Sequence, residues 1–203
     1  MKHPSTRALY AYWDERRGQR PAPEREDIDP VAIRHVLGDT FMLGADSADE
    51  PRFRLAGTRV CTLFCRELKG EPFVGIWGEA SRTHITDLLG SVMRHSIGFV
   101  ASVTGHAADG APADLEMLLL PLSAGGRERT RALGVLCTNE TPYWIGESPL
   151  GPLNLVDLRR AGSDEKIAPA TSSEAVPASV QLRHGFVVYR GGRDQPSQRG
   201  RTG

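Results

Sequence analysis

Hydrophobic and polar side chains alternate most regularly at residues 52–56, where every second position is apolar. The apolar residues and the arginines between them are Phe53, Leu55, Arg52 and Arg54. This period of two predicts a strand with one buried face. A preceding apolar stretch at residues 40–45 is predicted as its antiparallel partner, with a turn between the two.

A short helix is predicted directly after this strand. Gly57 ends the strand, and Thr58 belongs to the residue types that cap helices. Three apolar side chains fall on one side of the expected helix: Val60, Leu63 and Phe64. Gly70 then permits the backbone to reverse after Leu68. Strand, helix and turn therefore follow one another within residues 52–70.

The longest helical pattern occupies residues 79–97, and Gly98 is expected to end it. Its inward stripe has the spacing i, i+3, i+4, i+7 and consists of Ile85, Leu88, Leu89, Val92 and Ser96. Three more strands are predicted after this helix, at residues 99–107, 115–122 and 131–139. The second of them is apolar at nearly every position, as expected of a central strand. Asp109-Gly110 marks the turn before it.

A predicted helix at residues 5–17 ends at Gly18 and is rich in aromatic side chains. Three large side chains that it offers for contacts are Leu9, Tyr12 and Trp13. Two explanations are open at this point. This side packs on the chain's own core, or it is an interface with a second protein, such as another copy of the chain.

The chain divides into three predicted segments. Residues 1–38 form an N-terminal helical extension, whose last part is a helix that begins at Asp29-Pro30. Residues 39–160 form the main domain. Residues 161–203 form a flexible tail that is initially rich in Ala, Ser and Pro, with a short strand near residues 184–190.

Charge and composition narrow the possible partners. The 203 residues include 25 basic and 25 acidic side chains, so the net charge is zero and no global field attracts nucleic acid or a membrane surface. The longest apolar run, Met117–Leu120, is far too short to span a bilayer. The first residues lack the apolar core of a signal peptide, which predicts a cytoplasmic protein.

Two longer motifs give the chain a resemblance to a known family. The first is RFRLAGTRVCTLFCRELKG at residues 52–70, and the second is ADGAPADLEMLLLPL at residues 108–122. Together with the order of two strands, helices and three strands, they resemble the PAS sensor domain. The resemblance implies an α/β domain of the α+β type, with a five-stranded antiparallel sheet, helices on one face and an N-terminal helical extension.

Shorter motifs make the resemblance narrower. Leu9-Tyr10, Tyr12-Trp13, the Asp27–Pro30 stretch and Phe53–Thr58 are similar to those of small stand-alone bacterial PAS proteins. The late GFVVYRGGR segment fits the same group. This implies a non-catalytic sensor or adaptor that acts on signalling proteins through protein contacts, as a homodimer. The alternative is a PAS sensor that binds haem or a metabolite; the resemblance specifies no cofactor.

The resemblance also implies where a ligand would lie, between the sheet and the short helices. Phe64, Phe73, Trp77 and Leu88 would line or close such a pocket, with Met117 and Cys137 on the sheet floor. The alternative is that these six side chains simply fill the core.

Two chromophores can be weighed against the residues present. The stretch from Cys65 to Gly70 resembles the flavin motif of light-sensing PAS domains, but Phe64, Glu67 and Lys69 replace its asparagine, phenylalanine and glutamine. Without those amides, burying a flavin ring would be costly. A haem iron would need an axial ligand, and the long helix offers His84 and His95.

Other chemistry has little support in the sequence. Cys61 and Cys65 are four residues apart, but a metal site would need two further ligands. Three cysteines in total do not form a disulfide framework. The chain contains no Gly-x-Ser-x-Gly nucleophile motif, and its acidic residues are scattered. We therefore expect neither a metal site nor an enzyme.

Overall fold

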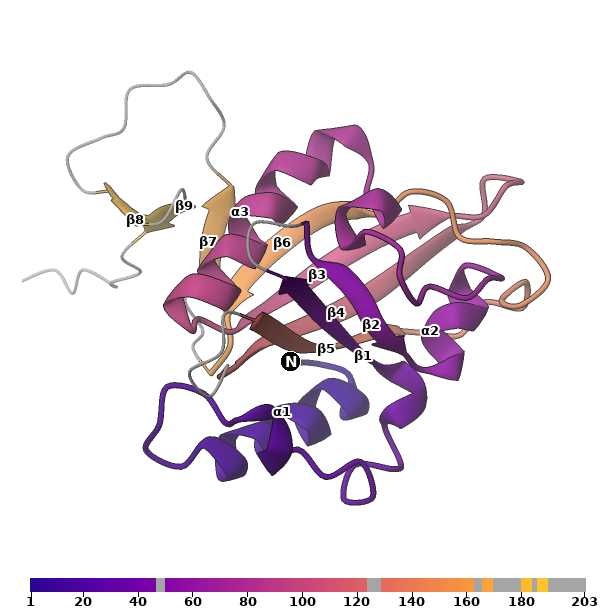
Figure 1. The fold of residues 1–203 in the computed structure, drawn as a ribbon. Helices are drawn as coiled ribbons and strands as arrows, with labels where there is room; N and C mark the ends of the chain where they lie inside the picture. Colours follow the sequence, from indigo (N-terminus) through magenta and orange to yellow (C-terminus); the bar gives the residue numbers. More distant parts are fainter. Residues whose placement is uncertain (47–49, 124–128, 163–165, 170–179, 184–185, 190–203) are drawn as a thin grey trace, which may run out of the picture.

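An antiparallel sheet forms the centre of the protein (Figure 1). The computed structural model describes residues 1–46, 50–123, 129–162, 166–169, 180–183 and 186–189. Six main strands follow the order β2-β1-β5-β4-β3-β6. They are β1 (Thr40–Asp46), β2 (Arg52–Ala56), β3 (Phe99–His106), β4 (Pro112–Leu122), β5 (Arg129–Thr138) and β6 (Asn154–Arg160).

Three short strands extend the sheet beyond β6, in the order β7, β9, β8. They are β7 (Lys166–Pro169), β8 (Val180–Arg183) and β9 (Phe186–Tyr189). β9 lies within the stretch near residues 184–190 where a short strand was predicted, and it pairs with β8 as an antiparallel partner. β7 lies inside the predicted flexible tail; residues 163–165, 170–179, 184–185 and 190–203 of that tail lie outside the described residues.

The predicted fold class is confirmed, with one correction to the number of strands. Five strands were expected, and β6 makes six in the main sheet. The strand was missed because residues 154–160 show no clear alternation, and Leu158 is their one fully buried side chain. β6 pairs with β3 along most of its length, so the sheet partner fixes it rather than its own pattern.

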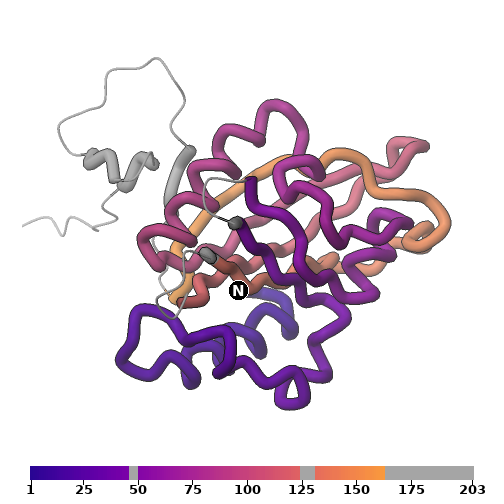
Figure 2. Tube along the Cα trace, in the orientation of Figure 1, coloured from indigo at the N-terminus to yellow at the C-terminus, as the bar shows by residue number. Residues whose placement is uncertain are grey.

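Helices cover both faces of this sheet, as Figure 2 shows most simply. One face packs against α2 (Thr58–Leu63), η3 (Phe73–Ile76) and α3 (Glu79–His95). The opposite face packs against α1 (Pro4–Arg17) and the segment that follows it, with η1 (Arg25–Asp27) and η2 (Leu37–Asp39). We call these the α3 face and the α1 face of the sheet.

Strand β4 shows how one sequence serves both faces. Side chains on a strand alternate between the two sides. Leu115, Met117 and Leu119 belong to the core on the α3 face, whereas Leu118, Leu120 and Leu122 belong to the core on the α1 face. A strand buried on both sides reads as a nearly continuous apolar run, which is why its central position was predictable.

Three local predictions need correction. The helix expected after Asp29-Pro30 is a series of turns, in which the N–H groups of Arg34 and Val36 donate to the carbonyls three residues earlier. That spacing of three buries both Ile33 and Val36 against the sheet. Gly57, not Thr58, is the N-cap of α2. Ser96, with a φ of 54°, ends α3 before Gly98 is reached.

Candidate functional sites on the two faces of the sheet

Aromatic rings occupy the centre of the core on the α3 face. Phe73, in η3, lies with its ring centroid 5.6 Å from that of Phe41, 5.4 Å from that of Phe53 and 5.9 Å from that of Trp77. All four side chains are at most 1% exposed. The Phe41 ring is stacked on that of Phe73, the Phe53 ring is tilted and the Trp77 ring is edge-on, and such contacts at these distances are favourable beyond the burial of apolar area. Strands β1 and β2 and the η3 turn are therefore held together by one aromatic cluster.

Five of the six predicted pocket residues meet in this core, and one does not. Phe64, Phe73, Trp77, Leu88 and Met117 all belong to it. Cys137 lies on the α1 face instead. The register explains the correction, because residues directly opposite each other on neighbouring strands share a face: Cys137 is opposite Glu116, whereas Met117 is opposite Leu136.

Trp77 carries the one polar feature that stands out in this core. Its indole Nε1–H is buried and has no hydrogen-bond partner among the described residues. Leaving such a donor unpaired is costly, and a native structure usually satisfies it. The two buried serines on the same side are both engaged: Ser91 Oγ donates to the Asp87 carbonyl, and Ser81 Oγ accepts from the Leu155 N–H.

The side chains weighed for chromophores do not lie in this core. His84 is half-buried and His95 is exposed on α3, so neither belongs to the buried residues around Trp77. Cys65 is exposed and adopts a left-handed backbone with a φ of 50°. The residues present therefore fit neither an axial haem ligand nor a thiol beside a buried flavin. In the described part of the chain, no three His, Cys, Asp or Glu side chains are grouped to hold a metal ion.

On the α1 face, the predicted interface residues are placed in two different ways. Leu9 is 0% and Trp13 is 5% exposed, and both pack against the sheet. Trp13 Nε1 also donates to the Pro121 carbonyl at 2.8 Å. Packing on the chain's own core is thus what these two residues do. Tyr12 remains half-buried, with the guanidinium carbon of Arg16 5.1 Å from its ring centroid.

Two buried carboxylates hold the start of α1 against the sheet. Glu116, in the middle of β4 and 4% exposed, accepts hydrogen bonds from the backbone N–H groups of Lys2 (2.7 and 3.0 Å) and His3 (2.9 Å). Asp39, 7% exposed, accepts from Ser5 Oγ at 2.7 Å. Arg59 Nε and Nη2 donate to the two oxygens of Asp39 at 2.6 and 2.9 Å. We call Glu116 and Asp39 the carboxylate pair.

Burial raises the pKa of each carboxylate and hydrogen bonds lower it, and the hydrogen bonds taken together prevail. Burial alone would raise the pKa of Glu116, but the N–H groups of Lys2 and His3 outweigh it, so this pKa lies below its usual value. The pKa of Asp39 is also lowered, since the donors on Arg59 and Ser5 outweigh its burial. Both side chains are therefore held as carboxylates at neutral pH.

Cys137 lies beside this pair, underneath α1. Its Sγ is 3.7 Å from Thr6 Oγ1 and 3.5 Å from the Glu116 carbonyl. Burial, above all, raises the pKa of the Cys137 thiol to about 12. A thiol reacts as its thiolate, so Cys137 is unreactive while α1 covers it.

The sequence reasoning missed the carboxylate pair. One signal was available: Glu116 is the single charged residue in the run from Leu115 to Leu122. A lone acid inside an apolar central strand needs a buried partner. That partner is the backbone of Lys2 and His3, which lie 114 and 113 positions earlier in the chain, and no local pattern indicates it.

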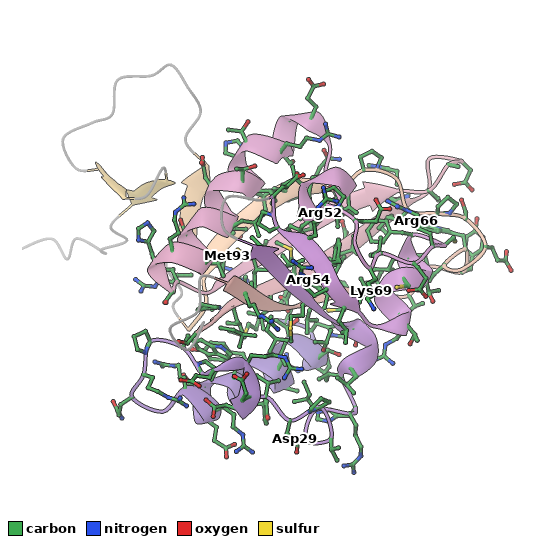
Figure 3. All side chains as sticks on the ribbon, in the orientation of Figure 1. Asp29, Arg52, Arg54, Arg66, Lys69 and Met93 are labelled. Atoms are coloured by element: carbon green, nitrogen blue, oxygen red, sulfur yellow. The ribbon has the colours of Figure 1, made fainter. Side chains whose placement is uncertain are left out.

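The other charged groups of interest are surface features. Figure 3 shows Arg52, Arg54, Arg66 and Lys69 around β2 and the segment after α2. Arg52 donates to the Gly70 carbonyl at 2.9 Å, and Arg66 lies 3.3 Å from a Glu71 oxygen. A surface cavity of about 210 Å³ lies at the edge of the core on the α1 face, to which its lining residue Ala22 belongs; its other lining residues are Arg20, Pro21, Glu24, Ser96 and Ser123.

The carboxylate pair should make stability depend on acid. Because both folded-state pKa values are lowered, the stabilisation is complete above about pH 5.5, where both groups are also ionised in the unfolded chain, and is lost as pH falls through the folded values. We expect Glu116→Gln to lower the unfolding free energy by about 1.5–3 kcal/mol at pH 7. Urea unfolding at pH 7 and pH 3 should show this difference shrinking in acid; a difference that stays constant would contradict it.

The fold and its sites define a small α+β domain of the sensor type. It has an aromatic core on one face of the sheet, and on the other an N-terminal helix whose start is held by two buried carboxylates. A family model of the PAS domain matches residues 1–137, so the chain belongs to the PAS domain family. The match begins at residue 1 and therefore includes α1. No curated protein matches the chain. Membership indicates a sensor role in signalling. None of the described helices is both long and apolar enough to cross a bilayer.

Proposed function

We propose that the chain is a non-catalytic cytoplasmic PAS sensor and adaptor that acts on signalling proteins through protein contacts, as a homodimer. The proposal is supported by the role of the buried charged side chains, which is structural. Among the described residues, Asp39 and Glu116 are the buried charged side chains, and both are saturated by structural hydrogen bonds. A catalytic acid or base must instead exchange a proton with a substrate. A change of contact surface is the form of output that fits.

The outer side of α1 is the proposed contact surface for the second copy. Leu9 and Trp13 face inward, so Tyr12 is the residue of the three that still reaches the surface. Its ring, with Arg16 stacked over it, combines the two residue types that most often anchor protein interfaces. The Tyr12 hydroxyl also accepts from the Asp29 N–H at 2.8 Å, which fixes the ring in place.

Tyr12→Ala should therefore weaken self-association by at least about tenfold in Kd. The measurement is light scattering across a dilution series, with circular dichroism to confirm the fold. Tyr143→Ala is the matched control, because Tyr143 is 85% exposed but lies far from α1 in the sequence, between β5 and β6. A wild-type protein that is monomeric at every concentration would contradict the homodimer. Equal weakening of self-association by both variants would show that α1 has no specific part in the interface.

A second candidate function is a sensor of a small molecule in the core of the α3 face. Trp77 favours it, because a bound molecule with a hydrogen-bond acceptor would satisfy the buried Nε1–H. The surroundings are apolar and the two buried serines are engaged, so the ligand class would be neutral and mostly apolar. A charged metabolite would lack a buried counter-charge there.

The absorption spectrum and native mass of freshly purified protein distinguish the two functions. Under the first, we expect no band beyond the tryptophan edge and a native mass equal to that of two chains with nothing added. Under the second, the native mass exceeds a whole multiple of the chain mass by the mass of the ligand, and Trp77→Phe loses the excess. Leu88→Met, a substitution of similar volume in the same core, is the control that should retain it.

A further inference from the structure

Residues 1–17 are attached to the sheet in an unusual way, and we call them the N-terminal cover. Their first five residues are fixed by polar contacts: the Lys2 and His3 N–H groups on Glu116, and Ser5 Oγ on Asp39. Their helical part is fixed by apolar contacts, chiefly those of Leu9 and Trp13. Beneath them lie Cys137 and an apolar sheet surface.

The cover can separate from the rest of the N-terminal layer at one place. Residues 18–21 are exposed, and Gly18 has a φ of 54°. From Ala22 onward the chain is again anchored, since Ala22, Ile28, Ile33 and Val36 are buried against the same face. Opening at residues 18–21 would also break the contacts of Tyr12 with Asp27 and Asp29 and those of Arg20 with Arg16 and Asp27. Three of these contacts are exposed and that between Tyr12 and the Asp27 carbonyl is partly buried, so water can replace them.

The polar attachment makes release easier than an apolar one would. On opening, the carboxylates of Glu116 and Asp39 and the N–H groups that they bind are all returned to water, so hydrogen bonds are exchanged rather than lost. Apolar residues in the same places would hold the cover at least as tightly, because buried charge is weak evidence for stability. Glu116 therefore makes closure specific for the correct chain segment while keeping it reversible.

We propose that the N-terminal cover is a releasable lid on the α1 face of the sheet, latched by Glu116 and Asp39. Its opening withdraws Leu9 and Trp13 from the core of the α1 face, and so uncovers Cys137 together with part of the apolar surface of β4 and β5, the two strands against which α1 packs. The lid extends the proposed function. It rests on that function only in one respect, the use of the uncovered surface as a site of protein contact. Opening itself needs neither a dimer nor a ligand.

Thiol labelling of Cys137 measures the opening directly. In a Cys61→Ser, Cys65→Ser background, Cys137 is the only thiol, and it is buried under Thr6. We expect slow labelling by N-ethylmaleimide whose rate hardly changes at low urea, as for local opening. A rate that rises with urea as steeply as global unfolding does would overturn the lid, because Cys137 would then be reached only by unfolding the whole domain.

The latch is tested in the same background. Glu116→Gln should speed labelling by about 10- to 100-fold, since it removes a charged acceptor of backbone N–H groups. Glu147→Gln, at an exposed position between β5 and β6, is the matched control and should leave the rate unchanged. An unchanged rate in Glu116→Gln would overturn the latch.

An engineered disulfide tests whether the cover lies on the sheet of its own chain or on that of a second copy. Thr6→Cys in that background should form a bond with Cys137, since Thr6 Oγ1 and Cys137 Sγ are 3.7 Å apart. The expected product on a non-reducing gel is a cross-linked monomer; a covalent dimer would overturn a lid formed within one chain. This result is independent of light scattering, so a monomeric protein can fail the homodimer proposal and still support the lid.

Discussion

Replacing Phe73 by Ala should lower the free energy of unfolding by about 3–5 kcal/mol, as expected for the loss of a fully buried phenylalanine. The side chain is 0% exposed and touches three other rings, from β1, from β2 and from the residue that follows η3. Its removal leaves a cavity that rigid strands on two sides cannot close. The lost unfolding free energy therefore includes two contributions: the transfer free energy of the ring from water into the core, and the cost of the cavity that is left.

Urea unfolding followed by circular dichroism measures this loss. Val74→Ala is the matched control, because Val74 is the next residue of η3 and is only partly buried. We expect it to lose well under half as much. A loss below about 1 kcal/mol for Phe73→Ala would indicate a loosely packed site. That outcome would favour the small-molecule function over signalling by contacts alone.

Several elements were predictable because their own side chains determine them. The stripe on the long helix reflects burial on one side, which leaves its period in the sequence. The alternation at residues 52–56 located the strand, but only Phe53 is buried there, whereas Leu55 is 47% exposed. β2 and α3 accordingly lie where they were predicted, within two residues at each end. The turn at Asp109-Gly110 was also predictable, because Gly110 has a φ of 86° that few other residues adopt readily.

Other elements depend on neighbours that the sequence does not place. β6 is a strand because β3 offers it a partner, and its side chains show no clear period. Residues 30–36 begin with a good helix signal, yet they form turns that bring Ile33 and Val36 onto the sheet. In both cases tertiary contacts outweigh a local preference worth only a few tenths of a kcal/mol per residue, to about 1 kcal/mol.

The candidate site was predictable on one face of the sheet and not on the other. Large apolar side chains near a helix-covered sheet gather in its core, so five predicted pocket residues meet there. The face of Cys137 depends on the register of β5 against β4, and a shift of one residue would reverse it. The carboxylate pair depends on contacts between the first five residues and positions 34 to 114 residues away. Such contacts become visible only in the folded chain.

The packing around Gly57 links the strand motif at residues 53–58 to the N-terminal layer. Gly57 follows β2 and caps α2, and its N–H donates to the Thr40 carbonyl at 2.8 Å. A Cβ atom added there would overlap the carbonyl oxygens of Leu37 and Gly38. These are backbone atoms of η2, directly next to Asp39, so they cannot turn aside as a flexible side chain can.

Gly57→Ala should therefore cost at least about 3 kcal/mol of unfolding free energy, the upper end for overpacking. Gly75→Ala is the control, because its added Cβ would meet only Pro72 Cβ, at 3.9 Å. We expect that variant to change stability by less than about 0.5 kcal/mol. Since η2 carries Asp39, Gly57→Ala should also speed the labelling of Cys137. If stability falls and the labelling rate does not rise, the distortion stays in α2, and the latch does not depend on the position of η2.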